Sequence, residues 1–294
     1  MDASMGPVSG KNCLVTGATS GIGAVTALSL ARLGGTVVVA GRHPAKCAHQ
    51  VERIKQETGN PRVEALVADL SSQTQVRRFA SEFRNRFSRL DVLVNNAGAY
   101  YTKREVSADG LEMTFALNHL GHFLLTNLLL EPLSASPSAR VVNVSSSAHV
   151  HGKIAFDDLQ GERHYERLVA YGQSKLANLL FTYELSRRLQ GSRVTANALD
   201  PGHVATNLGG NNGWLRVKLR NLLRRNLISP ERGAETGVYL ASSPAVEGIS
   251  GRYFRQCTAV QSSDASYDVA AAERLWRISA ELTGFTRLAP AGIP

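Results

Sequence analysis

The sequence predicts an α/β fold with one doubly wound parallel sheet flanked by helices. Short apolar runs rich in β-forming residues alternate with helical patterns along the 294-residue chain. The apolar runs are continuous rather than alternating with polar residues, as expected for strands buried on both faces. Strand–helix repetition of this kind indicates a parallel sheet with crossover helices. Because no repeat or low-complexity linker interrupts the pattern, we expect residues 1–294 to form a single domain.

Six apolar runs predict the strands, and five stretches with helical patterns predict the helices between them. The predicted strands are Asn12–Thr16, Thr36–Ala40, Val63–Ala68, Val92–Asn95, Arg140–Ser145 and Val194–Leu199. The predicted helices lie near 22–33, 45–58, 72–88, 109–130 and 168–190. The last of these has Arg187 and Arg188 in its final turn and Gly191 beyond it, which is a good C-terminal signal.

Composition excludes several classes of function. The net charge is +9 and the sequence pI is about 9.7, but the basic residues are scattered except in 214–225, so we expect no nucleic-acid binding. The three cysteines, Cys13, Cys47 and Cys257, are too far apart to suggest a disulfide framework or a zinc site. The longest apolar runs fall short of the ~18 residues of a membrane span, and the first residues lack signal-peptide features. We therefore expect a soluble cytoplasmic protein.

Three glycines, Gly17, Gly21 and Gly23, lie between the first predicted strand and the first predicted helix. Glycine there lets the backbone approach a pyrophosphate, while the helix N-terminus offers N–H donors and a positive dipole. The spacing Gly-x-x-x-Gly-x-Gly differs from the Gly-x-Gly-x-x-Gly of many dinucleotide domains. The pattern favours a Rossmann arrangement that binds a dinucleotide, and the alternative is a tight turn without a ligand.

Six further motifs follow in order along the chain. They are Asp69-Leu70, Asn95-Asn96-Ala97-Gly98, Asn118, Val144-Ser145-Ser146, Tyr171-Gly172-Gln173-Ser174-Lys175 and Asp200-Pro201-Gly202. With the glycine motif, they make the chain resemble the short-chain dehydrogenase/reductase family over about residues 8–260. Tyr171 follows Ser146 by 25 positions, and this spacing, together with "NHLGHFLLTNLLL" and "YGQSKLANLLF", resembles the retinol dehydrogenase-like branch of the family. The members of that branch act on lipophilic alcohols and aldehydes.

Four polar residues are the candidate catalytic groups. Tyr171 and Lys175 are four residues apart on a helix, so they share one face, and the ammonium of Lys175 favours the ionised form of Tyr171. Tyr171 is the expected proton donor and acceptor. The resemblance implies that Lys175 also holds the nicotinamide ribose, that Ser146 binds the substrate oxygen, and that Asn118 holds a water that relays protons through Lys175. Ser145 and Ser147 compete with Ser146 for its role, and all three serines could simply cap the strand end.

The end of the second strand indicates which nicotinamide cofactor is used. Enzymes selective for NAD place an acid there to bind the ribose 2′-hydroxyl, whereas this chain has Arg42, with His43 and Lys46 nearby. Because arginine pairs well with phosphate, we expect NADP(H) rather than NAD(H); solvated loop charges are the alternative. The glycine loop has Thr19-Ser20 where many NADP-preferring relatives carry a second basic residue. The cofactor-binding residues that the resemblance implies are Gly17, Thr19, Ser20, Gly21, Ile22, Gly23, Arg42, Asp69, Leu70, Asn96, Ala97, Gly98, Tyr171, Lys175, Pro201, Gly202, Val204 and Thr206.

Three other segments lead to separate expectations. Residues 203–228 correspond to the substrate lid of the family, and within them 214–225 is amphipathic and basic. It is interpreted as a lid helix over an apolar pocket, or as a peripheral contact with anionic membrane. Residues 280–294 are expected to be a loose tail. His149 and His151 lack the partners that would define a metal site, so no metal is expected.

These observations predict an NADP(H)-dependent oxidoreductase that interconverts a carbonyl and an alcohol by hydride transfer. The expected substrate is lipophilic, such as a retinoid-, steroid-, polyketide- or terpenoid-like compound, and reduction is the expected direction. The alternatives are a nucleotide-sugar epimerase or dehydratase, and a non-catalytic NADP-binding protein. The resemblance also implies a homodimer through the helices near 109–130 and 168–190.

Overall fold

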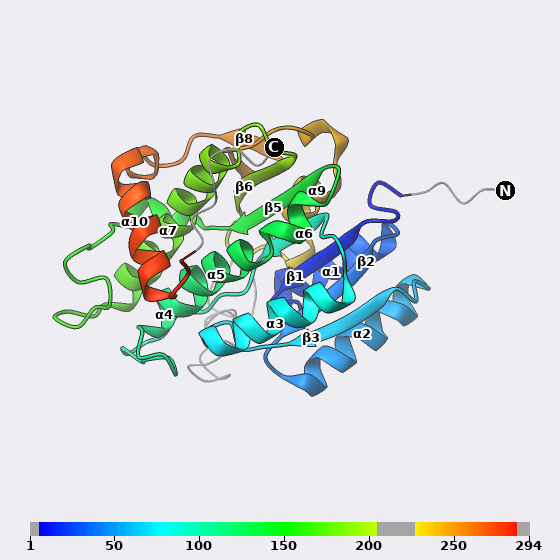
Figure 1. Ribbon diagram of the computed structural model, residues 1–294, viewed down its shortest axis with the longest axis horizontal. Coiled ribbons are helices and arrows are strands. Elements are labelled where there is room, and N and C mark those ends of the chain that lie inside the picture. Colours follow the sequence, from blue (N-terminus) through cyan, green and yellow to red (C-terminus); the bar gives the residue numbers. More distant parts are fainter. Residues whose placement is uncertain (1–5, 205–226, 287–294) are drawn as a thin grey trace.

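The computed structural model describes residues 6–204 and 227–286. Among these residues, eight strands form one sheet in the order β3-β2-β1-β4-β5-β6-β7-β8 (Figure 1). The strands are β1 Asn12–Thr16, β2 Thr36–Gly41, β3 Val63–Val67, β4 Val92–Asn95, β5 Ala139–Val144, β6 Val194–Asp200, β7 Tyr253–Arg255 and β8 Thr258–Val260. All neighbouring pairs are parallel except β7 with β8. The predicted doubly wound parallel sheet is confirmed.

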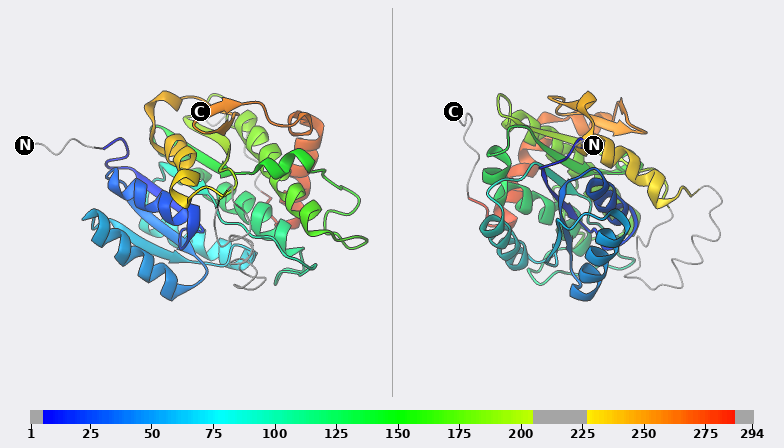
Figure 2. Two further views of the ribbon diagram at one scale, coloured as in Figure 1. Left: turned by 180° about the vertical axis from the view of Figure 1, so that it is seen from behind. Right: turned by 90° about the vertical axis from the view of Figure 1, so that its right-hand side faces the viewer.

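Helices cover both faces of this sheet (Figure 2). They are α1 Gly21–Arg32, α2 Pro44–Thr58, α3 Gln73–Arg86, α4 Met113–Phe115, the π-helical segment η1 Ala116–Leu120, α5 Gly121–Leu128, α6 Leu130–Ser134, α7 Arg167–Arg188, α9 Pro230–Ser242 and α10 Val269–Leu282. Short 3₁₀ segments are η2 Ser147–His151, η4 Pro244–Val246 and η5 Asp264–Tyr267.

Side-chain alternation along the strands sorts the core into two layers. In β1, Leu14 joins the cluster made with α3, α5 and α7, whereas Cys13 and Val15 join the cluster made with α1, α2 and α9. This division follows from the two-residue period of a strand. Both layers are apolar, which is why the strand runs are continuous rather than alternating in the sequence.

The six predicted strands agree with the observed ones to within one residue at each end. The predicted helix near 109–130 is instead three consecutive segments, α4, η1 and α5, because the helical hydrogen-bond pattern widens to a π-turn at 116–120. The sequence prediction missed α9, β7, β8 and α10. No helix in the described parts of the chain has both the length and the apolar character needed to cross a bilayer.

A tight hairpin joins β7 to β8 without a glycine. Its central residues, Gln256 and Cys257, have φ of 50° and 59°. Left-handed backbone at two adjacent non-glycine residues is costly and normally signalled by Asn-Gly or a similar pair. The turn therefore had no recognisable signal in the sequence.

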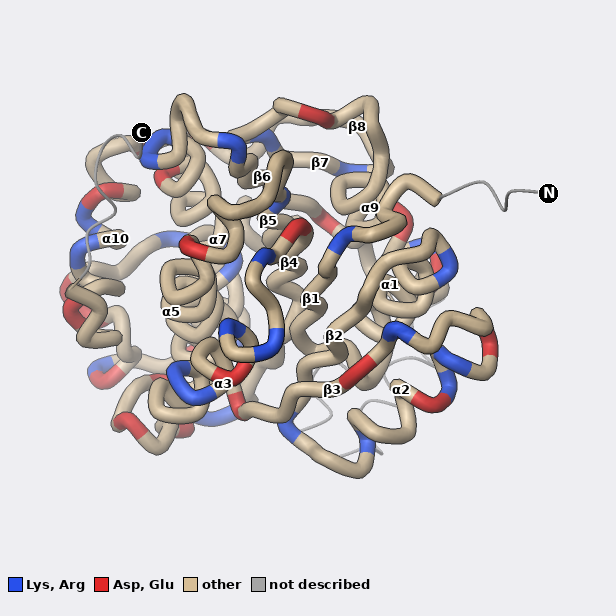
Figure 3. The backbone as a smooth tube through the Cα atoms, turned by 45° about the vertical axis from the view of Figure 1, so that its right-hand side comes forward, with Lys and Arg blue, Asp and Glu red and all other residues tan. Residues whose placement is uncertain are grey.

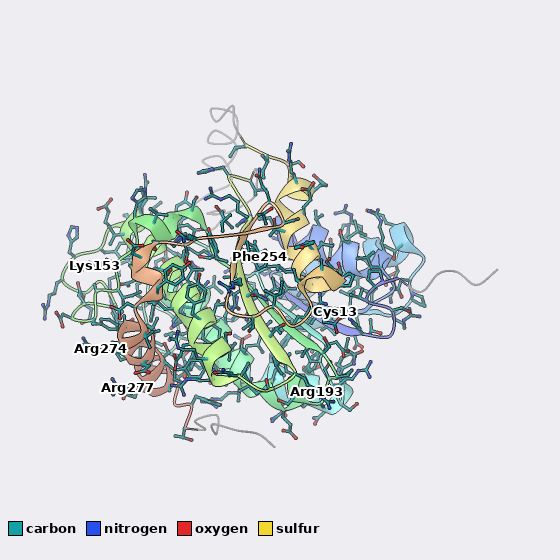
Figure 4. The ribbon with its side chains drawn as sticks, turned by 90° about the horizontal axis from the view of Figure 1, so that it is seen from above. Cys13, Lys153, Arg193, Phe254, Arg274 and Arg277 are labelled. Carbon is teal, nitrogen blue, oxygen red and sulfur yellow. The ribbon has the colours of Figure 1, made fainter. Side chains whose placement is uncertain are left out.

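The helix α10 packs along α7 (Figure 1) and reaches α5 through Trp276. Its Trp276 ring lies 5.0 Å from the Phe123 ring of α5 and 5.7 Å from the Phe181 ring of α7. The exposed side of α10 carries Arg274 and Arg277, which are labelled in Figure 4. The two helices from which a homodimer was expected are thus covered by a helix of the same chain over this part of their surface.

The expected loose tail at 280–294 begins too early. Residues 280–282 are the last residues of α10. Thr283 is fully buried, and Phe285 packs against the main core cluster. This correction concerns residues 280–286, and the remainder of the predicted tail lies outside the described residues.

Candidate active site

The predicted site residues gather at one edge of the sheet. The parallel register places the carboxyl ends of β1, β2, β4, β5 and β6 side by side. Every motif predicted from the sequence follows one of these strands, follows β3 beside them, or lies on a helix packed over this edge. Ligands of open α/β sheets bind at this edge, beside the point where the strand order reverses.

The loop after β1 packs directly against the loop after β4. Gly17 has φ of 64°, and a Cβ placed there would lie 2.8 Å from the Ala97 Cα. A Cβ on Gly23 would overlap the Asn96 amide nitrogen and the Gly17 carbonyl oxygen. The Asn96 Nδ2 donates to the Thr16 carbonyl oxygen over 2.8 Å. These contacts explain why positions 17 and 23 require glycine. They would exist with or without a bound dinucleotide, so they do not decide between the two interpretations.

The N-terminus of α1 supports the dinucleotide interpretation independently. Ser20 is its N-cap residue but makes no capping hydrogen bond, and the first turn contains no acidic residue. The first N–H groups of a helix have no partner within the helix, so they favour an anion. A pyrophosphate fits this N-terminus, and the exposed Ser20 and half-buried Thr19 and Ile22 flank it.

Arg42 lies at the end of β2 with its side chain exposed, and its Nε is 3.2 Å from the His43 Nε2. It is close enough to Tyr101 to oppose the rise in the Tyr101 pKa that burial causes. No acid occupies the end of β2. After β3, the Asp69 carboxylate accepts the N–H and hydroxyl of Ser71, while the Leu70 side chain is buried in the core.

Lys175 has its ammonium in the interior, next to Tyr171. The residue is 3% exposed, and its Nζ lies 5.6 Å from the centre of the Tyr171 ring. The Nζ donates to the Val144 carbonyl oxygen over 3.0 Å. Burial lowers the pKa of Lys175 to about 8, and the nearby carboxylate of Asp200 acts in the opposite direction. An ammonium with so few partners is costly to bury, which marks a candidate functional group.

The structure separates the three serines after β5. The Ser145 hydroxyl is buried and donates to the Lys175 carbonyl oxygen over 2.9 Å, so Ser145 has a structural partner. The Ser146 hydroxyl accepts the Ala148 N–H over 3.2 Å, which leaves its own proton available to donate. Ser146 is half-buried, and Ser147 begins η2. The geometry therefore favours Ser146 over Ser145 for a contact with substrate.

Asn118 is fully buried on the π-helical segment η1. Its Oδ1 accepts the Ala99 N–H over 2.9 Å, and its Nδ2 donates to the Ala99 carbonyl and to the Ser174 hydroxyl. A Cβ on Gly98 would lie 3.3 Å from the Asn118 Oδ1 and 3.6 Å from the Lys175 Nζ. Asn118 thus joins the loop after β4 to α7, and π-turns of this kind are frequent at functional sites.

The segment after β6 turns at Gly202, which has φ of 80°. The Gly202 N–H donates to the Asp200 Oδ1 over 2.9 Å, and the Arg255 Nη2 lies 2.9 Å from the Asp200 Oδ2. Val204 pairs with Ile228 in a parallel bridge. Pro201, Gly202 and Val204 therefore share the sheet edge with the other motifs. Thr206, and the predicted lid helix at 214–225, lie outside the described residues.

Sequence reasoning missed two polar contacts behind this edge. One is the Asp200–Arg255 ion pair, whose partners are 55 residues apart. The other is His149, which was considered only as a metal ligand. Its hydrogen-bond partners are the backbone carbonyl of Ser146 and the backbone N–H of Ser263, so no residue-type signal could have revealed them.

Within 6–204 and 227–286, no group of three or more metal-ligating side chains is assembled.

Comparison with known proteins places this geometry in a family. The model of the short chain dehydrogenase family matches residues 11–213. Human retinol dehydrogenase 13 is 44% identical over 94% of this chain and 86% of its own length. Human polyprenol dehydrogenase is 45% identical over 92% of this chain and 84% of its own length. The chain belongs to the short-chain dehydrogenase/reductase family, and the predicted resemblance to its retinol dehydrogenase-like branch is confirmed.

Solved structures agree with this assignment. A crystal structure of an uncharacterised protein from Mycobacterium paratuberculosis has a TM-score of 0.79 and 36% identity, with 98% of each chain covered. The Pseudomonas aeruginosa RhlG/NADP active-site complex has a TM-score of 0.67 and 28% identity, covering 84% of this chain and 94% of that one. The protein is accordingly an oxidoreductase of the dehydrogenase class that uses a nicotinamide cofactor.

Proposed function

We propose that the protein is an NADP(H)-dependent enzyme that interconverts a lipophilic carbonyl compound and its alcohol, acting mainly as a reductase. The observation that carries the proposal is the buried Lys175 ammonium beside Tyr171, at the sheet edge where Ser146 has its hydroxyl proton free. A Tyr–Lys pair and a hydroxyl donor are suited to moving a proton to and from a carbonyl oxygen.

Each residue has a distinct role in this proposal. The nicotinamide supplies the hydride when it is bound. Tyr171 gives a proton to the oxygen that becomes the alcohol, and Lys175 stabilises the resulting tyrosinate by its positive charge. Ser146 donates a hydrogen bond to the same oxygen and stabilises its developing negative charge. Asn118 ties η1 to the loop after β4 and to α7 by hydrogen bonds. The relay of protons through a water at Asn118 stays a prediction.

The cofactor contacts follow from the loops already described. The N-terminus of α1, with Thr19, Ser20, Gly21 and Ile22, would hold the pyrophosphate. Asp69 and Leu70 would flank the adenine, and Asn96, Ala97 and Gly98 would lie along the ribose that Lys175 and Tyr171 contact. Pro201, Gly202, Val204 and Thr206 are proposed to contact the nicotinamide end.

The preference for NADP(H) rests on Arg42. Its exposed guanidinium stands where an NAD-selective enzyme has an acid, and it can pair with a 2′-phosphate through two N–H groups. The related RhlG protein forms its active-site complex with NADP. Arg42→Asp should shift the ratio of kcat/KM for NADPH over NADH towards NADH by at least ~10-fold, a loss of about 1.4 kcal/mol in discrimination. An unchanged ratio would place the phosphate site elsewhere.

Apolar side chains exposed near the catalytic residues support a lipophilic substrate. Val150, four residues after Ser146, is 55% exposed, and Leu168 and Val169, just before Tyr171, are 62% and 50% exposed. The segments that carry them, η2 and α7, pack together. The names of the relatives, retinol and polyprenol dehydrogenases, refer to lipophilic alcohols.

The deciding experiment is NADPH oxidation, compared with NADH, by the purified protein over a panel of carbonyls. The panel runs from retinal, steroids and long-chain ketones to quinones and small polar aldehydes. Turnover with NADPH on the lipophilic members supports the whole proposal. Turnover on polar members alone would refute the substrate class, and binding of NADPH without turnover on any member would favour the non-catalytic alternative.

We further propose a cytoplasmic enzyme that meets anionic membranes through residues 214–225. The charges of the described residues are mixed, with Lys and Arg interspersed among Asp and Glu in Figure 3, so the basic 214–225 segment is the proposed contact. Cosedimentation with vesicles containing phosphatidylserine should be lost when its arginines are replaced by glutamine. Equal sedimentation of both forms would refute the contact.

A further inference from the structure

His149 lies buried behind Ser146 and contacts it twice. The residue is 2% exposed. Its Nδ1 is 2.6 Å from the Ser146 carbonyl oxygen, and its own backbone N–H donates to the same oxygen over 3.1 Å. On the other side of the ring, the Ser263 backbone nitrogen is 3.1 Å from the His149 Nε2.

These contacts define the protonation state of the ring. A backbone N–H can only donate, so Nε2 must be the acceptor from Ser263 and carry no proton. Nδ1 then carries the proton and donates it to the Ser146 carbonyl. Burial lowers the pKa of His149, which favours this neutral form against the opposing effects of the Ser146 carbonyl and Asp200. The ring thus has both nitrogens satisfied in one tautomer.

The surroundings hold the ring in place. Its centre lies 5.1 Å from that of the Tyr253 ring on β7, edge to face. Asp200 on β6 and Arg255 on β7 are the charged groups whose fields reach it, and they are paired with each other. His149 therefore links the serine after β5 to the segment that follows β8, 114 residues later in the chain.

The position of the Ser146 hydroxyl depends on this link. Ser146 has extended backbone, with φ −172° and ψ 156°, immediately before the 3₁₀ turn η2. The two hydrogen bonds from His149 fix its carbonyl and hence the peptide plane that follows it. A misplacement of about 1 Å in a catalytic group can cost about 10²-fold in rate, so this orientation matters for a hydroxyl that must face a substrate oxygen.

We propose that His149 is a positioning residue for catalysis, which holds Ser146 through the Nδ1–H bond to its carbonyl and anchors it through Nε2 to Ser263. The inference rests on the proposed function, because it assigns to Ser146 the contact with the substrate oxygen.

Two substitutions divide the two bonds of the ring. In His149→Asn, the amide Nδ2 takes the place of Nδ1 and can donate to the Ser146 carbonyl, while the bond to Ser263 is lost. In His149→Gln, the amide oxygen takes the place of Nε2 and can accept from Ser263, while the bond to Ser146 is lost. Each variant loses one hydrogen bond, so their melting temperatures should fall by similar amounts.

The kinetic expectation differs between the two variants. With saturating NADPH and a carbonyl substrate, His149→Asn should keep kcat within about 3-fold of the parent. His149→Gln should lower kcat by at least ~10-fold with an unchanged dissociation constant for NADPH. His151→Gln is the matched control, because His151 is exposed on the same turn, and it should leave kcat unchanged. Equal losses of kcat in His149→Asn and His149→Gln would overturn the proposal.

A double-mutant cycle tests whether the effect passes through Ser146. In a Ser146→Ala background, His149→Gln should have little further effect on kcat, because the group that it positions is gone. A further loss as large as in the parent would overturn the proposal, since His149 would then act by another route.

Hydrogen exchange provides a readout that needs no turnover. The amides of 147–150 should exchange faster in His149→Gln than in the parent but not in His149→Asn, and the amides of 263–267 should show the opposite pattern. If the parent protein reduces no carbonyl on the panel, the proposed function falls, and the exchange pattern alone decides whether His149 holds Ser146. Identical exchange in both variants would refute the inference.

Discussion

Lys175 shows at the scale of one residue how burial shapes the chemistry of the site. Its ammonium has the Val144 carbonyl as a hydrogen-bond partner and lies in the field of the Asp200 carboxylate, and its own positive charge helps to lower the pKa of the nearby His122. His122 is held neutral, because burial lowers its pKa to about 3. Asp200 is therefore the charged neighbour that favours the protonated form of Lys175.

The activity should depend on pH through Lys175. A pKa of about 8 means that the ammonium is present below pH 8 and is lost as the pH rises through that value. Because kcat/KM reports the free enzyme, kcat/KM for NADPH in carbonyl reduction should fall above about pH 8. A profile that stays level to pH 10 would contradict this assignment.

Asp200→Asn tests the origin of the falling limb of the pH profile, the decrease in kcat/KM above about pH 8. The carboxylate raises the pKa of Lys175, so its removal should move the falling limb of kcat/KM to lower pH. Asparagine keeps an oxygen that can accept the Gly202 N–H, so the turn after β6 should survive. Asp157→Asn, at an exposed position of the 152–166 loop, is the control and should leave the profile in place. An unmoved limb in Asp200→Asn would remove Asp200 from the mechanism.

Tyr171→Phe tests the proposed proton donor. Turnover should fall by at least ~10²-fold, the range expected when a general acid is removed, while the dissociation constant for NADPH stays within about 3-fold. Tyr239→Phe, on α9 and away from the site, should leave turnover unchanged. Near-parental turnover in Tyr171→Phe would exclude it as the proton donor.

At the scale of single residues, most of the candidate catalytic residues could be predicted from the sequence, but the hydrogen bonds that hold them in place could not. Ser146, Tyr171 and Lys175 stand in short motifs whose spacing can be read along the chain. The resemblance already preferred Ser146 over Ser145, and the hydrogen bond from Ser145 to the Lys175 carbonyl supplies the physical reason. His149 has main-chain partners, and a main-chain partner leaves no mark in the sequence.

At the scale of elements, close packing limits which side chains the glycine loop can carry. Gly23 sits in the first turn of α1, where a side chain would meet Asn96 and the Gly17 carbonyl. Gly237, inside α9, has room for a methyl group, because the atom nearest to an added Cβ is the Leu199 Cδ2 at 3.6 Å. The two glycines therefore form a matched pair.

Gly23→Ala and Gly237→Ala should have opposite effects. Overpacking costs about 1–3 kcal/mol, so Gly23→Ala should lower the melting temperature and weaken NADPH binding by about 10-fold or more. Gly237→Ala should raise the free energy of unfolding by about 0.5–1 kcal/mol, with unchanged NADPH affinity. Calorimetry measures the stability of the two variants, and fluorescence titration measures their affinity for NADPH. Intact NADPH affinity in Gly23→Ala would show that the loop tolerates a side chain.

The elements that the sequence prediction missed had weak or unusual signals. The hairpin of β7 and β8 turns through Gln256 and Cys257 rather than Asn-Gly, and each strand has only three residues. For α9 the signals were present, since Ser229 caps Arg232 and Pro230 begins the helix. The neighbouring Gly-rich and basic segment obscured them, because it interrupts the strand–helix alternation just before this helix.

At the scale of the whole molecule, α10 closes the layer of helices that includes α5 and α7. Trp276 is 3% exposed and packs between Phe123 and Phe181, with the Arg188 guanidinium 4.3 Å from its ring centre. The sequence prediction named the helices near 109–130 and 168–190 as a dimer surface but did not include α10, which covers part of both. Sequence periodicity shows that a helix has an apolar face but does not show what covers it.

Trp276→Ala tests how much this docking contributes to stability. Removing a buried tryptophan should lower the free energy of unfolding by about 3–5 kcal/mol, measured by urea denaturation. Glu273→Ala, on the exposed side of α10, should change it by less than about 0.5 kcal/mol. A loss below about 1 kcal/mol in Trp276→Ala would show that α10 adds little to the stability of the fold.

The place of α10 in the chain has a consequence for biosynthesis. A ribosome adds about 5–20 residues per second, and the earlier parts of a chain begin to fold first. Every strand of the sheet is synthesised before α10. The faces of α5 and α7 that carry Phe123 and Phe181 therefore stay exposed while the chain is still growing. During that interval, the nascent protein offers chaperones an aromatic surface that the finished molecule no longer displays.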